Sequence, residues 1–163
     1  MNMGLSTVTN QPKLTPTLEK AKWLCDQAGT RLTEKRLRVL KVLLLSEIPL
    51  TAYELADAYF DYFDAKIPTM SVYRILDFLV SMHLVHKVSS ASKYIACTYI
   101  TCDSQHGLTQ FLICERCQQV AEIIVPGEVA EAISQQVGNA GFVMAHSQLE
   151  VQCVCKTCME LTQ

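Results

Sequence analysis

Residues 68–97 read PTMSVYRILDFLVSMHLVHKVSSASKYIAC, and they join a helical pattern directly to a hairpin pattern. Thr69 follows a proline and begins a stretch whose apolar residues recur at helical spacing. Leu84–Val88 and Lys93–Cys97 alternate in polarity around the turn Ser89–Ser92, which predicts a β-hairpin. The residues expected on the buried face of the helix are Val72, Leu76 and Leu79 or Val80. An exposed helix followed by a two-stranded ribbon is typical of the end of a winged-helix domain.

Three more helices are predicted before this stretch. Thr15-Pro16 offers an N-cap hydroxyl and a proline at the first helical position, and that helix ends near Gly29. A second helix begins after Thr33. Thr51-Ala52-Tyr53-Glu54 is a capping box that opens a short third helix. An eight-residue link then leads to Thr69, so the elements occur in winged-helix order.

The outer side of the fourth helix and a basic cluster form a candidate DNA-binding surface. The first two turns of a recognition helix meet base edges, and an arginine there can bond guanine O6 and N7 together. Basic side chains near the start of the second helix suit phosphate contacts. The candidates are Arg31, Lys35, Arg36, Tyr53, Ser71, Tyr73 and Arg74. A solvated helix face with a chance basic cluster is the alternative.

Two Cys-x-x-Cys pairs, Cys114/Cys117 and Cys155/Cys158, predict a metal site near the end of the chain. The two-residue spacer lets both thiolates of a pair reach one ion, and four thiolates make a closed tetrahedral zinc site. No coordination position stays open, so the zinc is expected to be structural. Cys153 is an alternative third ligand, although the spacing favours Cys155. Two unrelated thiol pairs are the other interpretation.

A second candidate metal site mixes nitrogen, sulfur and oxygen donors from both halves of the chain. It comprises His86 in the ribbon, Cys97 at its end, His106 in the following loop and Glu122 on a later strand. Such a site would fill according to metal supply and would fix the angle between the two halves. One thiolate with two imidazoles and a carboxylate suits Zn²⁺ better than Fe²⁺. His146 and Cys153 are weaker candidates for an additional site.

Composition separates the chain into two unlike parts. Residues 1–96 carry 12 basic and 9 acidic residues, whereas residues 97–163 carry 2 and 7. This asymmetry suggests a nucleic-acid-facing domain joined to a different one. No apolar run approaches the roughly 18 residues of a membrane span. The polar N-terminus lacks a signal-peptide pattern, so the eight cysteines are expected to be metal ligands and reduced thiols of a cytoplasmic protein.

The second half is predicted to mix strands and a helix. Phe111–Ile113 and Val120–Val125 are short strands that flank the first cysteine pair. A helix follows Pro126-Gly127, and Phe142–Val151 is a further strand. The whole chain is therefore expected to belong to the α+β class.

From about Leu18 to Leu161 the chain resembles the ferric uptake regulator family of bacterial metalloregulators. The markers are Arg31-Leu32-Thr33-x-x-Arg36, Pro68-Thr69-x-Ser71-Val72-Tyr73-Arg74-x-Leu76 and Ile113-Cys114-x-x-Cys117. Two further segments look most like the zinc-responsive members of that family: Val85-His86-Lys87-Val88 and Tyr94-Ile95-Ala96-Cys97.

The resemblance implies a winged-helix DNA-binding domain at 1–97, with a flexible N-terminal arm, and a small α/β metal-binding dimerisation domain at 98–163 that includes the hinge. It implies a bacterial homodimer that binds double-stranded operator DNA and represses zinc-uptake genes when zinc-loaded. Two zinc ions per subunit are expected. The regulatory ligands would be His86, Cys97, His106 and Glu122, and the two cysteine pairs would hold the structural ion. No enzymatic activity, organic cofactor or membrane association is expected.

Three alternatives stay open. An iron, manganese or peroxide sensor of the same family would place a His-rich run before the first cysteine pair, which is reduced here to Gln105-His106. A thiol oxidoreductase would use a Cys-x-x-Cys motif that opens a helix, whereas Cys114 follows strand residues. A scaffold with structural zinc would bind DNA without a metal response.

Overall fold

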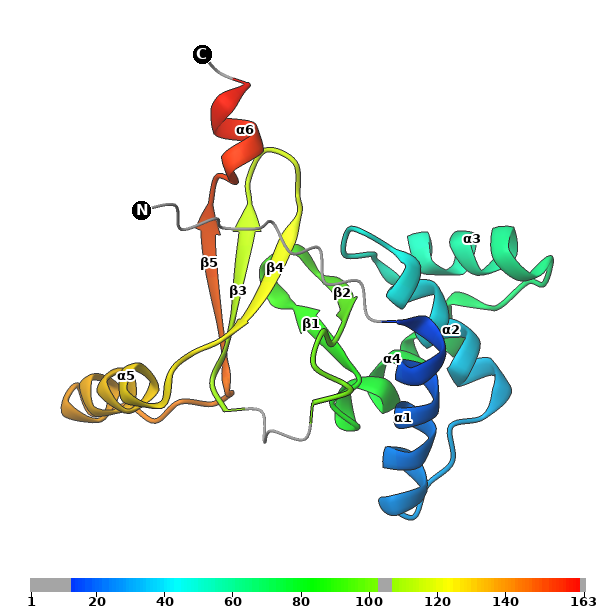
Figure 1. Cartoon of the computed structure of the whole chain (residues 1–163), viewed down its shortest axis with the longest axis horizontal. Helices are drawn as coiled ribbons and strands as arrows, with labels where there is room; N and C mark the ends of the chain where they lie inside the picture. Colours follow the sequence, from blue (N-terminus) through cyan, green and yellow to red (C-terminus); the bar gives the residue numbers. More distant parts are fainter. Residues whose placement is uncertain (1–12, 103–106, 162–163) are drawn as a thin grey trace.

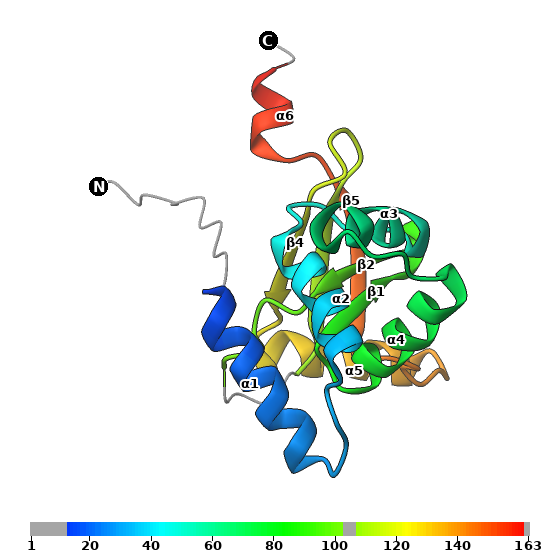
Figure 2. The ribbon, with the colours of Figure 1, turned by 90° about the vertical axis from the view of Figure 1, so that its right-hand side faces the viewer.

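The computed structural model describes residues 13–102 and 107–161, and most of the predicted N-terminal arm lies outside them. Figures 1 and 2 show a helical lobe beside a sheet lobe, with a two-stranded ribbon between them. The helical lobe contains α1 (Leu14–Gln27), α2 (Glu34–Leu45), α3 (Ala52–Phe63) and α4 (Thr69–Ser81). Among the described residues, no helix is long and apolar enough to cross a membrane.

The helix starts follow local hydrogen-bonding rules. The capping box is confirmed, because Glu54 N donates to Thr51 Oγ1 at 3.2 Å and Thr51 N donates to Glu54 Oε2 at 2.7 Å. Helix α4 begins at Thr69 as predicted. Helix α1 begins at Leu14, two residues before the predicted first helical residue Pro16, and the Thr17 hydroxyl donates back to the carbonyl oxygen of Lys13, the residue at the N-cap.

Helix α3 is longer than predicted. Tyr59 and Phe63 lie one helical turn apart with ring centroids at 5.1 Å, and this pair extends the helix to Phe63. Asp64 then adopts a left-handed backbone with φ 47° and ends the helix. The link to α4 therefore runs only from Asp64 to Pro68, instead of over the eight residues predicted.

One apolar core holds the helical lobe together. The inner face of α4 is Val72, Ile75, Leu76 and Leu79, whereas Val80 is half-buried. Leu40 of α2 and Leu55 of α3 are fully buried in the same core. The core extends past the ribbon to Cys97 and Ile100.

The ribbon is an antiparallel pair of β1 (Val85–Val88) and β2 (Lys93–Ala96), as the sequence predicts. The turn between them, Ser89–Ala91, is a short 3₁₀ helix. Leu50 N donates to Tyr94 O and Tyr94 N donates to Leu50 O, at 3.0 and 2.7 Å. This bridge ties the ribbon to the segment that precedes α3.

The sheet lobe is built on three strands in the order β4-β3-β5. Strand β3 (Thr109–Cys114) is antiparallel to β4 (Val120–Ile124) and parallel to β5 (Gln148–Cys153). Helix α5 (Gly127–Asn139) lies on the crossover from β4 to β5, and the short α6 (Lys156–Glu160) follows β5. The chain is thus α+β, as predicted.

The predicted strand Phe142–Val151 is wrong at both ends. The strand runs from Gln148 to Cys153, and its first partner is Thr109, the first residue of β3. Residues before Gln148 have no neighbouring strand to pair with among the described residues, so they stay irregular. Phe142 is consequently 71% exposed.

Candidate metal centres and DNA-facing surface

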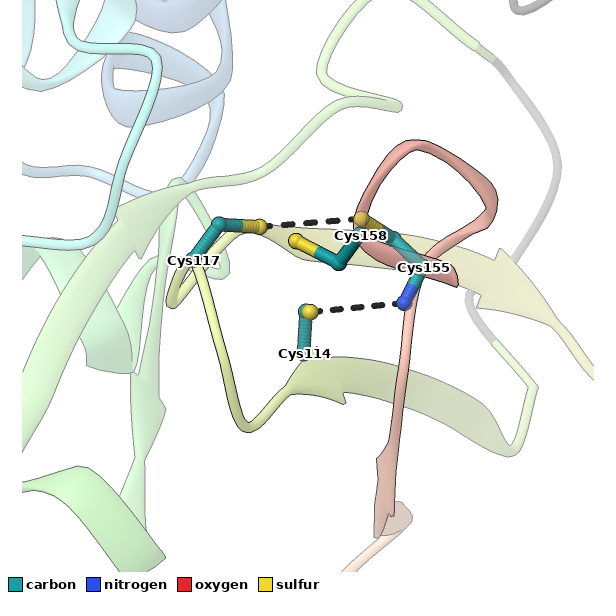
Figure 3. A group of neighbouring side chains, drawn as sticks. All are labelled: Cys114, Cys117, Cys155 and Cys158. Carbon is teal, nitrogen blue, oxygen red and sulfur yellow. Dashed lines mark hydrogen bonds between the residues drawn. The ribbon is translucent and has the colours of Figure 1, made fainter. Parts of the chain in front are cut away.

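The two Cys-x-x-Cys pairs meet at one end of the sheet, as Figure 3 shows. Cys114 is the last residue of β3, and Cys117 lies in the turn that follows. Cys155 caps the N-terminus of α6, which contains Cys158. The parallel pairing of β3 with β5 brings the two distant pairs together, and all four sulfurs lie within 4.8 Å of one another.

The spacing of these sulfurs fits one tetrahedral ion. Cys117 Sγ and Cys155 Sγ are 3.7 Å apart. Zinc–sulfur bonds of about 2.3 Å at tetrahedral angles put neighbouring sulfurs about 3.8 Å apart. Backbone N–H groups of Cys117 and Cys155 lower the pKa of Cys114 to about 6. The neighbouring thiols, Cys155 first, raise the pKa of Cys158 to about 12, because adjacent thiolates disfavour one another without a cation.

Cys153 is not part of this group. Its thiol lies 3.5 Å from the carbonyl oxygen of Ile113, within the parallel ladder. The backbone N–H of Cys155 instead donates to Cys114 Sγ at 3.3 Å. Of the two alternatives that the sequence left open for the third cysteine, the structure brings Cys155 into the cluster.

A second group of donors lies where the ribbon meets the sheet. His86 is in β1, Cys97 directly follows β2, and Glu122 is in β4. One ligand atom from each lies within 4.8 Å of the others. Cys97 is fully buried and Glu122 is 8% exposed, so the group is largely shielded from water.

The distances in this second group also fit a zinc ion. His86 Nε2 is 3.0 Å from Glu122 Oε1, and Cys97 Sγ is 3.7 Å from the same oxygen. Tetrahedral zinc would separate such donor pairs by roughly 3.3 and 3.6 Å. His86 Nε2 is buried and has no well-aligned hydrogen-bond partner among the described residues, despite its contact with the carboxylate. A buried nitrogen in this position is suited to binding a cation.

Glu122 is held in place by the hinge segment. Thr98 N donates to Glu122 Oε2 at 2.7 Å, and the Tyr99 hydroxyl lies 3.4 Å from the Glu122 carbonyl oxygen. Burial alone would raise the pKa of Glu122, but the contacts with His86 and Thr98 outweigh it and lower that pKa. Burial, then the Glu122 charge, raises the pKa of Cys97. Sequence reasoning missed Thr98, because a backbone donor leaves no residue-type signal.

Two predicted metal ligands are not placed in either group. His106 lies outside the described residues, so its predicted place beside His86 and Cys97 stays a prediction. His146 lies on the wall of a cavity between the lobes that His83 also lines, and it belongs to neither donor group.

Most of the predicted DNA-binding residues are accessible. Arg74 is exposed on α4, whereas Ser71 and Tyr73 are half-buried. Arg31, Lys35 and Tyr53 are also exposed, and Tyr53 is exposed to 66%.

Arg36 is engaged within the helical lobe. Its guanidinium carbon lies 3.5 Å from the ring centroid of Phe78 on α4, and its Nη1 donates to Arg31 O at 2.7 Å. Both contacts orient elements of the lobe, so the side chain has a packing role beside its predicted phosphate contact.

These features define a class: winged-helix proteins that carry thiolate-rich metal-ligand clusters in an attached sheet lobe. The model of the Ferric uptake regulator family matches residues 27–152. The chain belongs to that family.

Relatives and solved structures agree with this assignment. The zinc uptake regulation protein of Escherichia coli (strain K12) is 34% identical over 145 residues, covering 88% of this chain and 82% of that protein. A zinc uptake regulator complexed with zinc and DNA has a TM-score of 0.81 at 30% identity, covering 93% and 98% of the two chains. The crystal structure of holo XcZur has a TM-score of 0.74 at 30% identity, covering 89% and 98%. The comparisons confirm the winged-helix fold class predicted from sequence.

Proposed function

We propose that this chain is a cytoplasmic bacterial repressor that binds operator DNA as a zinc-loaded homodimer and shuts off zinc-uptake genes. The observation that carries the proposal is the group of His86, Cys97 and Glu122. His86 lies in the ribbon, Cys97 directly follows it and Glu122 lies on the sheet, so one ion held by all three would tie the lobes together.

The ribbon links this donor group to the proposed DNA-reading helix α4. Leu84, which precedes β1, follows α4 after only two residues, so the orientation of the ribbon is linked to that of the helix. His86, Cys97 and Glu122 would hold the zinc, which supplies the positive charge that draws the three donors together. A ligand can shift a conformational equilibrium only through contacts that differ between the two states, and donors from both lobes provide such contacts. His106 is the proposed fourth ligand.

The donor types support zinc over the other metals sensed in this family. A buried thiolate beside an imidazole suits Zn²⁺, whereas Fe²⁺ and Mn²⁺ sensors are expected to use nitrogen and oxygen donors. The Cys97 thiol therefore argues against an iron, manganese or peroxide sensor. The four-cysteine cluster would hold a second, structural zinc, giving two per subunit.

The DNA-binding part of the proposal rests on α4 and the start of α2. Arg74, Tyr73 and Ser71 would face base edges, and Arg31 and Lys35 would contact phosphates. Tyr53 and Arg36 complete the proposed surface. A solved relative at 30% identity is described as complexed with zinc and DNA, which supports this placement.

The homodimer is proposed to form through the sheet lobe. No residue of α5 is buried, although the helix carries an apolar stripe that includes Val129, which is 48% exposed. Val143 is 92% exposed just beyond α5. A second copy of the chain would cover this surface. The proposed division places the DNA-binding domain at 1–97 and the dimerisation domain at 98–163.

A thiol oxidoreductase fits the geometry less well. Cys114 ends a strand and opens no helix, and α6, which Cys155 caps, has only five residues. All four sulfurs face one another, which suits a closed metal site better than an exposed reactive thiol pair.

The proposal is tested by operator binding titrated against free zinc, with iron and manganese as parallel arms. Of the three metals, zinc alone should induce operator binding. The protein should remain a dimer at every zinc concentration. Binding that ignores zinc would contradict the repressor proposal and favour a scaffold. A response to iron or manganese in place of zinc would favour the other sensors of the family.

A further inference from the structure

A carboxylate on the sheet lobe holds the turn of the ribbon. Glu150 lies in the middle of β5. Its Oε1 accepts a hydrogen bond from Ser89 N at 2.6 Å, and its Oε2 accepts one from Ser90 N at 2.9 Å. The two residues are 60 or more positions away along the chain, so the contact joins the two lobes.

Neighbouring side chains on β5 reinforce the same contact. Gln148 Nε2 donates to Lys87 O at 2.8 Å and to Glu150 Oε1 at 3.1 Å. Gln152 Nε2 lies 3.3 Å from Ser90 Oγ. Gln148, Glu150 and Gln152 alternate along the strand and so share one face of it. This face of β5 is complementary to the polar edge of the ribbon turn.

An apolar contact lies beside these hydrogen bonds. Val88, the last residue of β1, is fully buried against Phe111 and Ile113 of β3. The His86 ring also lies 5.2 Å from the Phe111 ring, between centroids. The ribbon is therefore packed on the sheet along its length, from the metal-ligand group to the turn.

We propose that Glu150 is a positioning residue that docks the ribbon turn on the sheet and so sets the distance between His86 and Glu122. This inference rests on the proposed function, because its consequence is the zinc affinity of that donor group. No donor atom of Glu150 belongs to either metal-ligand group.

The ribbon is attached to the sheet lobe at two points. Ser89 lies three residues beyond His86, or about 10 Å along an extended strand. A rigid ribbon attached only at the metal ligands could pivot about them. A second attachment at the turn removes that freedom, which lowers the entropy lost when the ligands assemble around an ion.

A carboxylate is well suited to this task. Two adjacent N–H groups at the start of a 3₁₀ turn match its two oxygens, and hydrogen bonds to an ionised acceptor are roughly twice as strong as neutral ones. Burial alone would raise the pKa of Glu150, but the hydrogen bonds from Ser90, Ser89 and Gln148 outweigh it and lower that pKa. The side chain is thus held in its charged form.

The test uses the full-length protein with Glu150→Ala and Glu150→Gln. Alanine removes both acceptors, and glutamine turns one acceptor into a donor that faces an N–H group. Glu47→Gln, at an exposed carboxylate between α2 and α3, is the control for charge. Three quantities are measured: exchange of the Ser89 and Ser90 amides, zinc affinity by chelator competition, and operator affinity at saturating zinc.

Loss of a charged hydrogen-bond pair should lower the zinc affinity of the donor group formed by His86, Cys97 and Glu122 by about tenfold or more in both Glu150 variants. The Ser89 and Ser90 amides should exchange faster, and the four-cysteine zinc should stay bound. Glu47→Gln should match the wild type in zinc affinity and exchange. If Glu150→Ala fails to fold, Gln148→Ala is used instead. This variant removes the adjacent contact with Lys87 and should also lower the zinc affinity of the donor group at the hinge.

Unchanged zinc affinity and unchanged amide exchange in the folded variants would overturn the role of Glu150. That result leaves the proposed function intact if the wild type still binds operator only with zinc. Conversely, a wild type that ignores zinc on DNA defeats the proposed function, and the docking role is then decided by amide exchange and zinc affinity alone.

Discussion

Residues of the same or similar type have different roles in this protein. Cys97 and Cys114 are both buried thiols, yet burial raises the pKa of Cys97 while backbone N–H groups lower that of Cys114 to about 6. Arg36 and Lys35 are adjacent bases, but only Arg36 stacks on Phe78. Burial and hydrogen bonding, more than residue type, decide what each group contributes.

Cys97→Ser should separate the two metal sites. Serine removes the thiolate from the donor group at the hinge and leaves the four cysteines of the other cluster in place. Zinc-dependent operator binding should weaken by about 10- to 100-fold, a range typical of lost metal-site interactions. Metal analysis after gel filtration should still find the chelator-resistant zinc. Wild-type zinc dependence in this variant would exclude Cys97 as a regulatory ligand.

Lys35→Ala and Arg36→Ala should differ in their effect on the stability of the helical lobe. Removing Lys35, an exposed side chain and a proposed phosphate contact, should weaken binding to any duplex and lower the salt slope by about one per site. Removing Arg36 breaks a cation–π contact and a hydrogen bond, so the helical lobe should lose about 1–3 kcal/mol of stability. Thermal unfolding and salt titrations of both variants measure these effects. Equal losses of thermal stability in the two variants would contradict the packing role of Arg36.

At the scale of elements, local sequence patterns predicted most helices and the ribbon. Features that depend on contacts between distant segments were not predicted. The capping box, the start of α4 and the ribbon follow from neighbouring residues, so the sequence predicts them. The end of α3, the start of β5 and the parallel pairing of β3 with β5 depend on tertiary partners. The members of both donor groups were predicted by type and spacing. Thr98 and Glu150 were missed, because hydrogen bonds donated by backbone N–H groups leave no motif in the sequence.

Arg74→Ala tests α4 as the element that reads DNA. Arg74 is exposed on this helix, opposite the buried Val72 and Leu76. One bidentate arginine–guanine pair is worth about 1–3 kcal/mol, so a dimer could lose up to roughly 10²–10⁴ in operator affinity. Binding to random duplex should change little, and both zincs should remain. An unchanged ratio of operator to random affinity would show that α4 does not read the bases.

Cys114→Ser and Cys153→Ser form a matched pair on strands β3 and β5. Cys114 lies in the four-sulfur cluster, and metal binding at such a site is coupled to folding. Its serine variant should lose the dimer or the fold. Cys153 lies 3.5 Å from Ile113 O and belongs to neither donor group, so its variant should keep dimer and zinc. Size-exclusion chromatography with metal analysis measures both, and a stable zinc-loaded Cys114→Ser dimer would refute the assignment.

At the scale of the whole molecule, the lobes are joined by polar groups more than by a large apolar core. Among the described residues, the fully packed members of the core shared by ribbon and sheet are Val88, Phe111 and Ile113. The donor group at one end of the ribbon and the polar side chains of β5 at its turn add polar contacts between the lobes. An interface of this kind can open and close with modest changes in free energy, as the proposed switch requires.

The most direct test follows zinc content and operator occupancy together in one chelator titration of the wild-type protein. We expect operator release to coincide with loss of the first zinc per subunit, while the second zinc and the dimer persist. This result would assign switching to the site at the hinge and folding to the four cysteines. Operator binding that persists after the first zinc leaves, or release only when the protein unfolds, would contradict the account.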